Sequence, residues 1–598
     1  MKYIIGVFSY LFLVFLFFTL FSSSVLAVQI GENNQISLLS VTDYSNGSRI
    51  GDVAYLDLQI RPGSGAVFLD SFPATRIDTQ VSARMANEIA CEYSQVDCSH
   101  YDFFYTIKAD ASTIGGPSAG AAITLLTLSS LLDQPLKKHL AVTGAISSGG
   151  VILPVDGIKE KVDAAEKKGY LMVLIPKLAF SDELENKTNI SSSHLLFRSQ
   201  FENNSINIFE VISLGEAFEL VTQNSFEFEQ NFSLNVPDEY VLRMKQTAES
   251  LCNRTDELFQ LTEHFDNEKL EPALSFINLS LDAKNNSQYY PQASFCYSAN
   301  VVLRELVLSV ASQDNLFKNY VSLNKSRLDF ETGVDGITLK TFSDLETYSI
   351  VKERLLESQQ YLDMLNVSDI NYSLLASAIE RYHSAVAWSA FFGMNGDDLN
   401  LDETSLRHAC EQELQSVYTR NNYLQTFMPR YMLQDLFLEI SGIVDYANDN
   451  ENALCLFKAS KAKSYADFLI TMSSLNNDTI KDLVYAKQTF ALNLISQQQQ
   501  NNVFPILGFS YYEYSKSLES DSYPSSLMFA ENSIAFSDLS KYFEKISADN
   551  FPIVQISFRE WLFFIAGVLT GLFLGMLIFW RKLSSKKHKK HVFKSKHR

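Results

Sequence analysis

A serine and a lysine stand 43 residues apart in surroundings that suit covalent catalysis. Ser118 lies in the segment GGPSAG, residues 115–120, and Lys161 lies in the segment VDGIKEKVDAAEKKGY. A serine hydroxyl attacks a carbonyl only when a base removes its proton, and a neutral lysine amine is able to do this. His139 is the one histidine between the two residues, and it lies in neither segment. The two side chains therefore have the types that a serine–lysine hydrolase needs.

The segment that follows Ser118 predicts the helix that would position it. AAITLLTLSSLL is small or apolar almost throughout and has no break until Pro135, which is typical of one buried helix of about four turns. Ser118 would then lie at the N-terminus, where unpaired backbone N–H groups and the positive end of the helix dipole favour an anion. The N–H groups of Ser118 and Ala119 could therefore form the oxyanion hole.

Lys161 can act as a base only if burial or a cationic neighbour lowers its pKa by several units. Its sequence position supports burial, because Lys161 follows Ile158 by three residues and precedes Ala165 by four, which places it on the inner face of a helix. Taken alone, each residue has a simpler interpretation. A serine in such a turn is more often a helix N-cap, and a lysine in KEK is usually solvated. The prediction rests on the two occurring together.

From Ser118 to Pro176 the sequence resembles, without a gap, the catalytic domain of the Lon proteases. The segments PSAG, VTG and GIKEK occur at the spacing of that family, together with the strand-like segments LAVTGAI, VILPV and LMVLIP. The resemblance implies that Ser118 is the nucleophile and that Lys161 is the general base. It also implies that Thr143, in VTGAI, hydrogen-bonds the lysine and helps to orient it.

Two departures from the Lon pattern limit what the resemblance implies. Lon proteases usually carry an acidic residue where this chain has Gly115, which leaves the fine control of the site open. No G-x4-G-K-[ST] loop occurs in the sequence, so the ATP-driven unfoldase of Lon is not expected. The resemblance is strongest to membrane-anchored archaeal relatives of Lon that lack the ATPase domain, and it implies no ATP, no cofactor and no metal ion.

Composition divides the chain into two parts. Residues 30–225 contain strand-like and helical segments, and the resemblance implies an α+β Lon-type proteolytic domain of the ribosomal-protein/sugar-kinase superfold. Residues 226–238 are expected to be a linker. Residues 239–550 contain few prolines and glycines and have apolar residues at helical spacing, which predicts a mostly α-helical domain of antiparallel helices. A tetratricopeptide-like array is one possibility, although the sequence has no fixed period.

Both ends of the chain carry long apolar segments. Residues 1–27 predict a signal peptide or an N-terminal anchor, and cleavage stays open. Residues 561–580 are 20 residues without a charge, which predicts a transmembrane helix, and the basic residues 581–598 predict a cytoplasmic tail. The membrane is therefore an expected partner. The expected location is the cell membrane, with the body of the chain as an extracytoplasmic ectodomain.

Cysteines, glycosylation motifs and charge agree with that location. The sequence has six cysteines and no C-x-x-C motif, which favours disulfides over a metal site, and six cysteines allow 15 pairings. Twelve N-x-[ST] motifs also suggest a glycoprotein. The formal net charge of −20 argues against nucleic acid as a partner. The cysteines are Cys91, Cys98, Cys252, Cys296, Cys410 and Cys455, and the motifs include those at Asn46, Asn186, Asn189, Asn253, Asn366 and Asn477.

Together these features predict a membrane-anchored, ATP-independent serine endopeptidase that acts on unfolded or flexible polypeptides outside the membrane. Lon domains assemble into rings, so the resemblance also implies a homo-oligomer. Two other classes stay open. A catalytically silent Lon-like scaffold would fit Gly115 and the absent ATPase loop, although it would need neither Ser118 nor Lys161. A small-molecule kinase of the same superfold would need a longer Gly/Ser-rich phosphate loop than GGPSAG.

Overall fold

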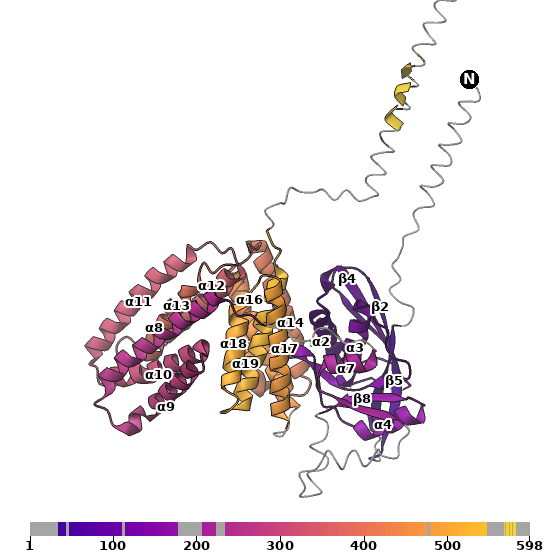
Figure 1. The fold of residues 1–598 in the computed structure, drawn as a ribbon, viewed down its shortest axis with the longest axis horizontal. Helices are drawn as coiled ribbons and strands as arrows, with labels where there is room; N and C mark the ends of the chain where they lie inside the picture. Colours follow the sequence, from indigo (N-terminus) through magenta and orange to yellow (C-terminus); the bar gives the residue numbers. More distant parts are fainter. Residues whose placement is uncertain are drawn as a thin grey trace, which may run out of the picture. The chain divides into compact units, whose positions relative to one another are not determined.

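The computed structural model divides the chain into two compact units, Met1–Lys545 and Ile546–Arg598. The first unit contains a sheet with its helices, followed by an array of helices (Figure 1). The described residues are 34–43, 47–110, 114–177, 206–222, 234–474 and 479–546, with a few helical residues between 567 and 581.

A seven-stranded mixed sheet organises the first part of the chain, in the strand order β3-β4-β2-β1-β5-β8-β9. β2 pairs antiparallel with β1 and β4, and the remaining neighbours pair parallel. The strands are β1 (Gln35–Asp43), β2 (Arg49–Pro62), β3 (Val67–Phe72), β4 (Tyr101–Lys108), β5 (Leu140–Val142), β8 (Met172–Pro176) and β9 (Asn207–Val211). These elements confirm the α+β character expected for this part of the sequence.

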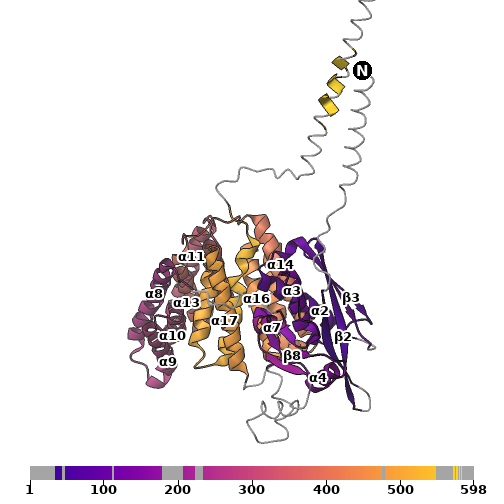
Figure 2. The ribbon, with the colours of Figure 1, turned by 45° about the vertical axis from the view of Figure 1, so that its right-hand side comes forward.

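Helices cover both faces of this sheet because its strands alternate apolar side chains between the faces. The helices are α2 (Ile77–Ser94), α3 (Gly120–Leu131), α4 (Ile158–Lys167) and α7 (Leu214–Val221). In β1, Ile36 and Leu38 belong to one core cluster with α2, α3 and α7, whereas Leu39 belongs to a second cluster with α4. Figures 1 and 2 show α2, α3 and α7 on the same side of the sheet.

A short hairpin connects β5 to α4. Its strands, β6 (Ala145–Ser147) and β7 (Val151–Leu153), form a separate two-stranded antiparallel sheet. Its tip, Ser148–Gly150, is fully buried, and both Gly149 and Gly150 have positive φ values. The hairpin is therefore separate from the seven-stranded sheet, and its tip packs against residues of α17 and α19, the helices at 480–500 and 523–537.

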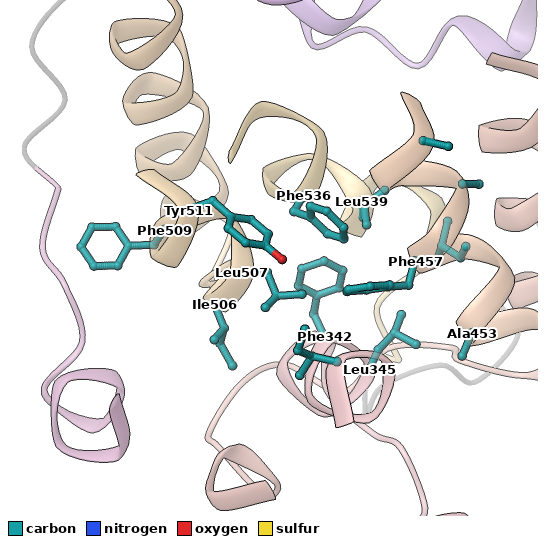
Figure 3. Packing of buried hydrophobic residues seen from close by; sticks show 14 of the residues in the cluster. Phe342, Leu345, Ala453, Phe457, Ile506, Leu507, Phe509, Tyr511, Phe536 and Leu539 are labelled. Carbon is teal, nitrogen blue, oxygen red and sulfur yellow. The ribbon is translucent and has the colours of Figure 1, made fainter. Parts of the chain in front are cut away.

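The second part of the unit is helical, as expected for residues 239–550. The helices are α8 (Asp238–Thr262), α9 (Asn267–Asn285), α10 (Tyr289–Ser309), α11 (Gln313–Asp335), α12 (Phe342–Asp363), α13 (Tyr372–Trp388), α14 (Glu403–Leu424), α15 (Gln434–Asn448), α16 (Asn452–Ser473), α17 (Ile480–Gln500), α18 (Ile506–Ser517) and α19 (Tyr523–Ser537). Aromatic side chains pack between these helices: the ring centroids of Phe457 in α16 and Phe536 in α19 lie 5.0 Å apart, and those of Tyr511 in α18 and Phe536 lie 5.5 Å apart (Figure 3).

Three disulfides pair the six cysteines in sequential order. Cys91–Cys98 joins the end of α2 to the turn before β4, Cys252–Cys296 joins α8 to α10, and Cys410–Cys455 joins α14 to α16. The structure thus selects one of the fifteen pairings that the sequence allowed.

The expected C-terminal transmembrane helix is contradicted. No helix in the described part of the chain is long and apolar enough to cross a membrane. A span needs about 20 predominantly apolar residues; α3 is apolar but has 12 residues, and α8 has 25 but carries charged residues along its length. Of residues 561–580, only scattered helical positions are described, and residues 1–27 and 582–598 lie outside the described residues. The expected single-pass location in the cell membrane is contradicted by the same finding.

Candidate active site

The turn that carries Ser118 is held against α2. Ser118 lies in a 3-10 turn, Pro117–Ala119, that precedes α3, so the α-helix itself begins two residues after the serine. The hydroxyl of Thr79 donates to the carbonyl of Gly116 at 3.2 Å, and the hydroxyl of Ser82 donates to the carbonyl of Pro117 at 3.4 Å. Two side chains of α2 therefore fix the backbone on which Ser118 sits.

Two backbone N–H groups at this turn have no partner among the described residues. They belong to Ser118 and Ala119, as expected for the first N–H groups of a helix. The next two N–H groups are paired: that of Gly120 donates to the carbonyl of Pro117, and that of Ala121 donates to the carbonyl of Gly144 at 3.0 Å. Ser118 is partly exposed. The turn thus offers an accessible hydroxyl beside two N–H groups that could bind an oxyanion.

Thr143 and Gly144 connect this turn to the central strands. The N–H of Gly144 donates to the carbonyl of Ser118 at 3.1 Å, and the N–H of Thr143 donates to the carbonyl of Leu174 in β8 at 3.1 Å. Ala141 packs with α4, so the alternation of the strand places Thr143 on the α4 face as well. Thr143 is fully buried, and its Oγ1 has no hydrogen-bond partner among the described residues. Leaving a buried hydroxyl without a hydrogen bond costs free energy, so this atom is available to a partner that binds at the site.

Lys161 is buried, as its sequence position predicted. It is 3% exposed, and it shares the inner face of α4 with Ile158, Val162 and Ala165. It makes no ion pair within the described part of the chain. Burial lowers the pKa of its ammonium to about 8 because the charged form loses its hydration. At neutral pH a useful fraction of the amine is therefore able to accept a proton.

An ion pair near Lys161 has no signal in the sequence. Arg49, in β2, binds both carboxylate oxygens of Asp156, with Nη1–Oδ1 and Nη2–Oδ2 distances of 3.1 and 2.5 Å, and also pairs with Asp43. Its hydrogen bond is the main reason that the pKa of Asp156 is lowered. Asp156 alone would raise the pKa of Lys161, whereas Arg49 lowers it. Arg49 therefore offsets part of the effect of Asp156 on the pKa of Lys161.

The structure brings the three predicted side chains onto neighbouring elements without hydrogen-bonding them to one another. The Ser118 turn contacts β1, and Gly157, at the start of α4, packs so closely on β1 that an added Cβ would lie 2.6 Å from Cγ2 of Val41. No hydrogen bond links Ser118, Thr143 and Lys161 through their side chains in the described chain. Catalytic hydrogen bonds are often long in a free enzyme and shorten when substrate binds.

Gly115, the departure from the Lon pattern, lies beside an arginine. A Cβ added to Gly115 would lie 2.5 Å from Cδ of Arg76, the residue before α2. Arg76 pairs with Asp78 at 3.7 Å instead of with an acidic residue at position 115. The arginine thus occupies the space where the family's acidic side chain would begin.

Comparisons with known proteins identify the same region. Residues 79–199 match the family model of the Lon protease (S16) C-terminal proteolytic domain. A Lon protease from Paraburkholderia phytofirmans is 35% identical over 130 residues, covering 21% of this chain and 16% of the relative. An archaeal Lon protease from Methanocaldococcus jannaschii is 30% identical over 148 residues, covering 23% of each chain. A Lon protease from Buchnera aphidicola is 41% identical over 90 residues, covering 15% of this chain and 11% of the relative.

The matched region contains all three predicted side chains. Ser118, Thr143 and Lys161 fall within residues 79–199, whereas the helices from α8 onward fall outside them. The chain spans less than a quarter of the length of each of these relatives. The resemblance to Lon proteases is confirmed for this part of the chain, and it supports a serine peptidase.

Proposed function

We propose that this chain is an ATP-independent serine endopeptidase that uses Ser118 as nucleophile and Lys161 as general base. The observation that carries the proposal is the burial of Lys161, which lowers its pKa to about 8 in a segment similar to the Lon proteolytic domain. A solvated structural lysine would show neither the burial nor the shift. The domain boundaries expected from the sequence, with the proteolytic domain over residues 30–225, form part of this proposal.

In the proposed reaction, Ser118 Oγ attacks the carbonyl carbon of the scissile peptide while its proton passes to Lys161 Nζ. The carbonyl oxygen gains the electron pair and is bound by the N–H groups of Ser118 and Ala119. The C–N bond then breaks, and the leaving amine takes the proton from Lys161. A water molecule hydrolyses the acyl ester by the same route, giving its proton to Lys161 and returning Ser118 to its hydroxyl form.

Thr143 has a supporting role in this proposal. Its buried Oγ1 has no partner among the described residues, and strand alternation from Ala141 puts Thr143 on the side of the sheet that packs with α4. A hydrogen bond to Lys161 in the substrate complex would satisfy this hydroxyl and orient the amine.

The proposed substrates are unfolded or flexible polypeptides. A peptide bond inside a helix or a central strand is not available to a nucleophile until the structure opens locally. The sequence contains no phosphate-binding loop that could couple ATP to unfolding, so capture of already open segments is the simplest route. The resemblance to Lon proteases also supports a homo-oligomer.

Labelling with a serine-directed phosphonate tests the proposal directly. We expect the wild-type chain to be labelled at Ser118, with no labelling of Ser118→Ala and little of Lys161→Ala, although both variants remain folded. The two losses should not add, because the residues act as one unit. Casein should be cleaved at the same rate with and without ATP. An unlabelled wild-type chain would instead favour the catalytically silent scaffold.

A further inference from the structure

The hairpin β6–β7 links the candidate active site to the helical region. Its first strand begins directly after Thr143 and Gly144, and its second strand leads to α4 and Lys161. Its Ile146 lies against the start of α3, where a Cβ added to Gly120 would be 3.0 Å from Ile146 Cγ2. A displacement of this hairpin would therefore move Gly144, which is hydrogen-bonded to Ser118 and Ala121, and the start of α4.

The tip of the hairpin is held by a buried lysine from α17. Nζ of Lys487 donates to Ser147 Oγ at 2.9 Å, to Ser148 Oγ at 2.7 Å and to the carbonyl of Ser148 at 2.5 Å. It also pairs with Glu531 of α19 at 2.8 Å, and Ser148 Oγ donates to the other oxygen of Glu531 at 2.5 Å. Lys487 and Glu531 are 0% and 1% exposed. An ammonium has three protons, so these four acceptors more than use its donor capacity, and at least two of them share one proton.

Apolar packing from the same two helices completes the site around the tip. Phe490, Ala491 and Leu494 of α17 and Ile534 of α19 belong to the core cluster that contains the inner residues of the sheet. A Cβ added to Gly149 would lie 3.0 Å from Ile534 Cδ1 and 3.2 Å from Phe490 Cδ1. The hairpin tip thus fits a slot that leaves no room for a side chain.

We infer that Lys487 and Glu531 are positioning residues for the proposed peptidase reaction. They fix the hairpin tip and, through β6, the position of Gly144 against Ser118 and the point at which α4 begins. This inference rests on the proposed function. If it holds, helices α17 and α19 are needed to keep the active-site residues in place. Lys487 and Glu531 do not touch the reacting atoms; they act through Ser147 and Ser148.

Two variants separate positioning from general stability. Lys487→Met removes the hydrogen bonds to the tip and leaves Glu531 as a buried, uncompensated charge. Adding Glu531→Gln removes that charge but does not restore the hydrogen bonds from Lys487. Lys352→Met is the matched control, because Lys352 is also buried and pairs with two carboxylates, Glu331 at 3.0 Å and Asp335 at 2.8 Å, away from the hairpin.

The measurements are the thermal midpoint and the kcat and KM for an unfolded peptide substrate, taken in the full chain. We expect Lys487→Met to lower kcat by about tenfold or more with little change in KM, since small misplacements of catalytic groups have effects of this size. The double variant should regain thermal stability but not kcat. Lys352→Met should lose stability with kcat unchanged at temperatures where it is folded. A kcat that recovers together with stability, or a folded Lys487→Met with wild-type kcat, would overturn the inference.

Two further measurements cover the other outcomes. If Lys487→Met does not fold, Ser147→Ala combined with Ser148→Ala removes the acceptor hydroxyls while keeping the Lys487–Glu531 pair, and the same loss of kcat is expected. If wild-type Ser118 is not labelled, the proposed function fails. Hydrogen exchange at residues 144–153 then decides the positioning claim: faster exchange in Lys487→Met than in Lys352→Met supports it, and equal exchange refutes it.

Discussion

If Lys161 is the general base, as proposed, the pH dependence of Ser118 labelling by a phosphonate should follow from the environment of Lys161. With a pKa of about 8, about one-tenth of the amine is neutral at pH 7, against about three in ten thousand for a lysine at 10.5. The rate of phosphonate labelling should therefore rise about tenfold per pH unit below pH 8 and level off above it. Burial supplies most of this effect, because it is the largest cause of the shift.

The assay compares the labelling rate of wild type with that of two variants from about pH 6 to about pH 10. Lys161→Arg should show no such rise, since a guanidinium stays charged over this range. Arg49→Gln should move the inflection to higher pH, because Arg49 lowers the pKa of Lys161 and Asp156 raises it. A flat wild-type profile, or an inflection near the pKa of an ordinary lysine, would refute the assignment of Lys161 as the base. Hydrolysis of the probe in buffer is the background to subtract.

Three further changes test other parts of the structure. Lys161→Met should raise the free energy of unfolding at pH 7 by up to about 3 kcal/mol, because burying the charged lysine lowers its pKa and so destabilises the folded wild-type protein. This destabilisation is complete below pH 8 and disappears as the pH rises toward 10.5. Denaturant titrations should therefore show a smaller gain at pH 10 than at pH 7. Thr143→Val should leave stability unchanged or raise it by about 1 kcal/mol while lowering kcat, since Oγ1 is buried without a described partner; a clear loss of stability would contradict this. Arg420→Met should lower the free energy of unfolding by about 3–5 kcal/mol, because buried Arg420 pairs with Glu88 at 3.0 Å and with Asp467 at 2.7 Å. A thermal or denaturant melt like that of wild type would show that these ion pairs do not stabilise the fold.

Local sequence patterns correctly predicted much of the sheet and the burial of Lys161. The strands LAV and MVLIP are fully or mostly buried, and the spacing of Ile158, Lys161 and Ala165 places all three on the inner face of α4. The predicted start of α3 was less accurate, because Pro117–Ala119 forms a 3-10 turn and Ser118 therefore precedes the α-helix. Such differences at helix ends are expected, since the first turn often adopts 3-10 geometry.

Long-range partners could not be predicted in the same way. Arg49 and Asp156 are 107 positions apart, and Lys487 and Ser148 are 339 positions apart, so no local spacing links either pair. In the sequence, Lys487 has the surroundings of an ordinary helical lysine, and most such lysines are solvated. Only the packing of α17 and α19 against the hairpin shows that this lysine is buried.

The burial of the hairpin tip also sets an order of events during synthesis. Ser148 leaves the ribosome 339 residues before Lys487, and the two must meet before the tip is enclosed. At typical elongation rates that interval lasts roughly 20–70 s. During it, the segment with Ser118 and Lys161 exists without the helices that enclose its hairpin. Under the proposed function, a newly made chain would acquire peptidase activity only after α17 and α19 have emerged and enclosed the hairpin tip. Labelling of stalled chains that end before α17 should therefore be absent, and labelling equal to that of the released protein would rule out such a delay.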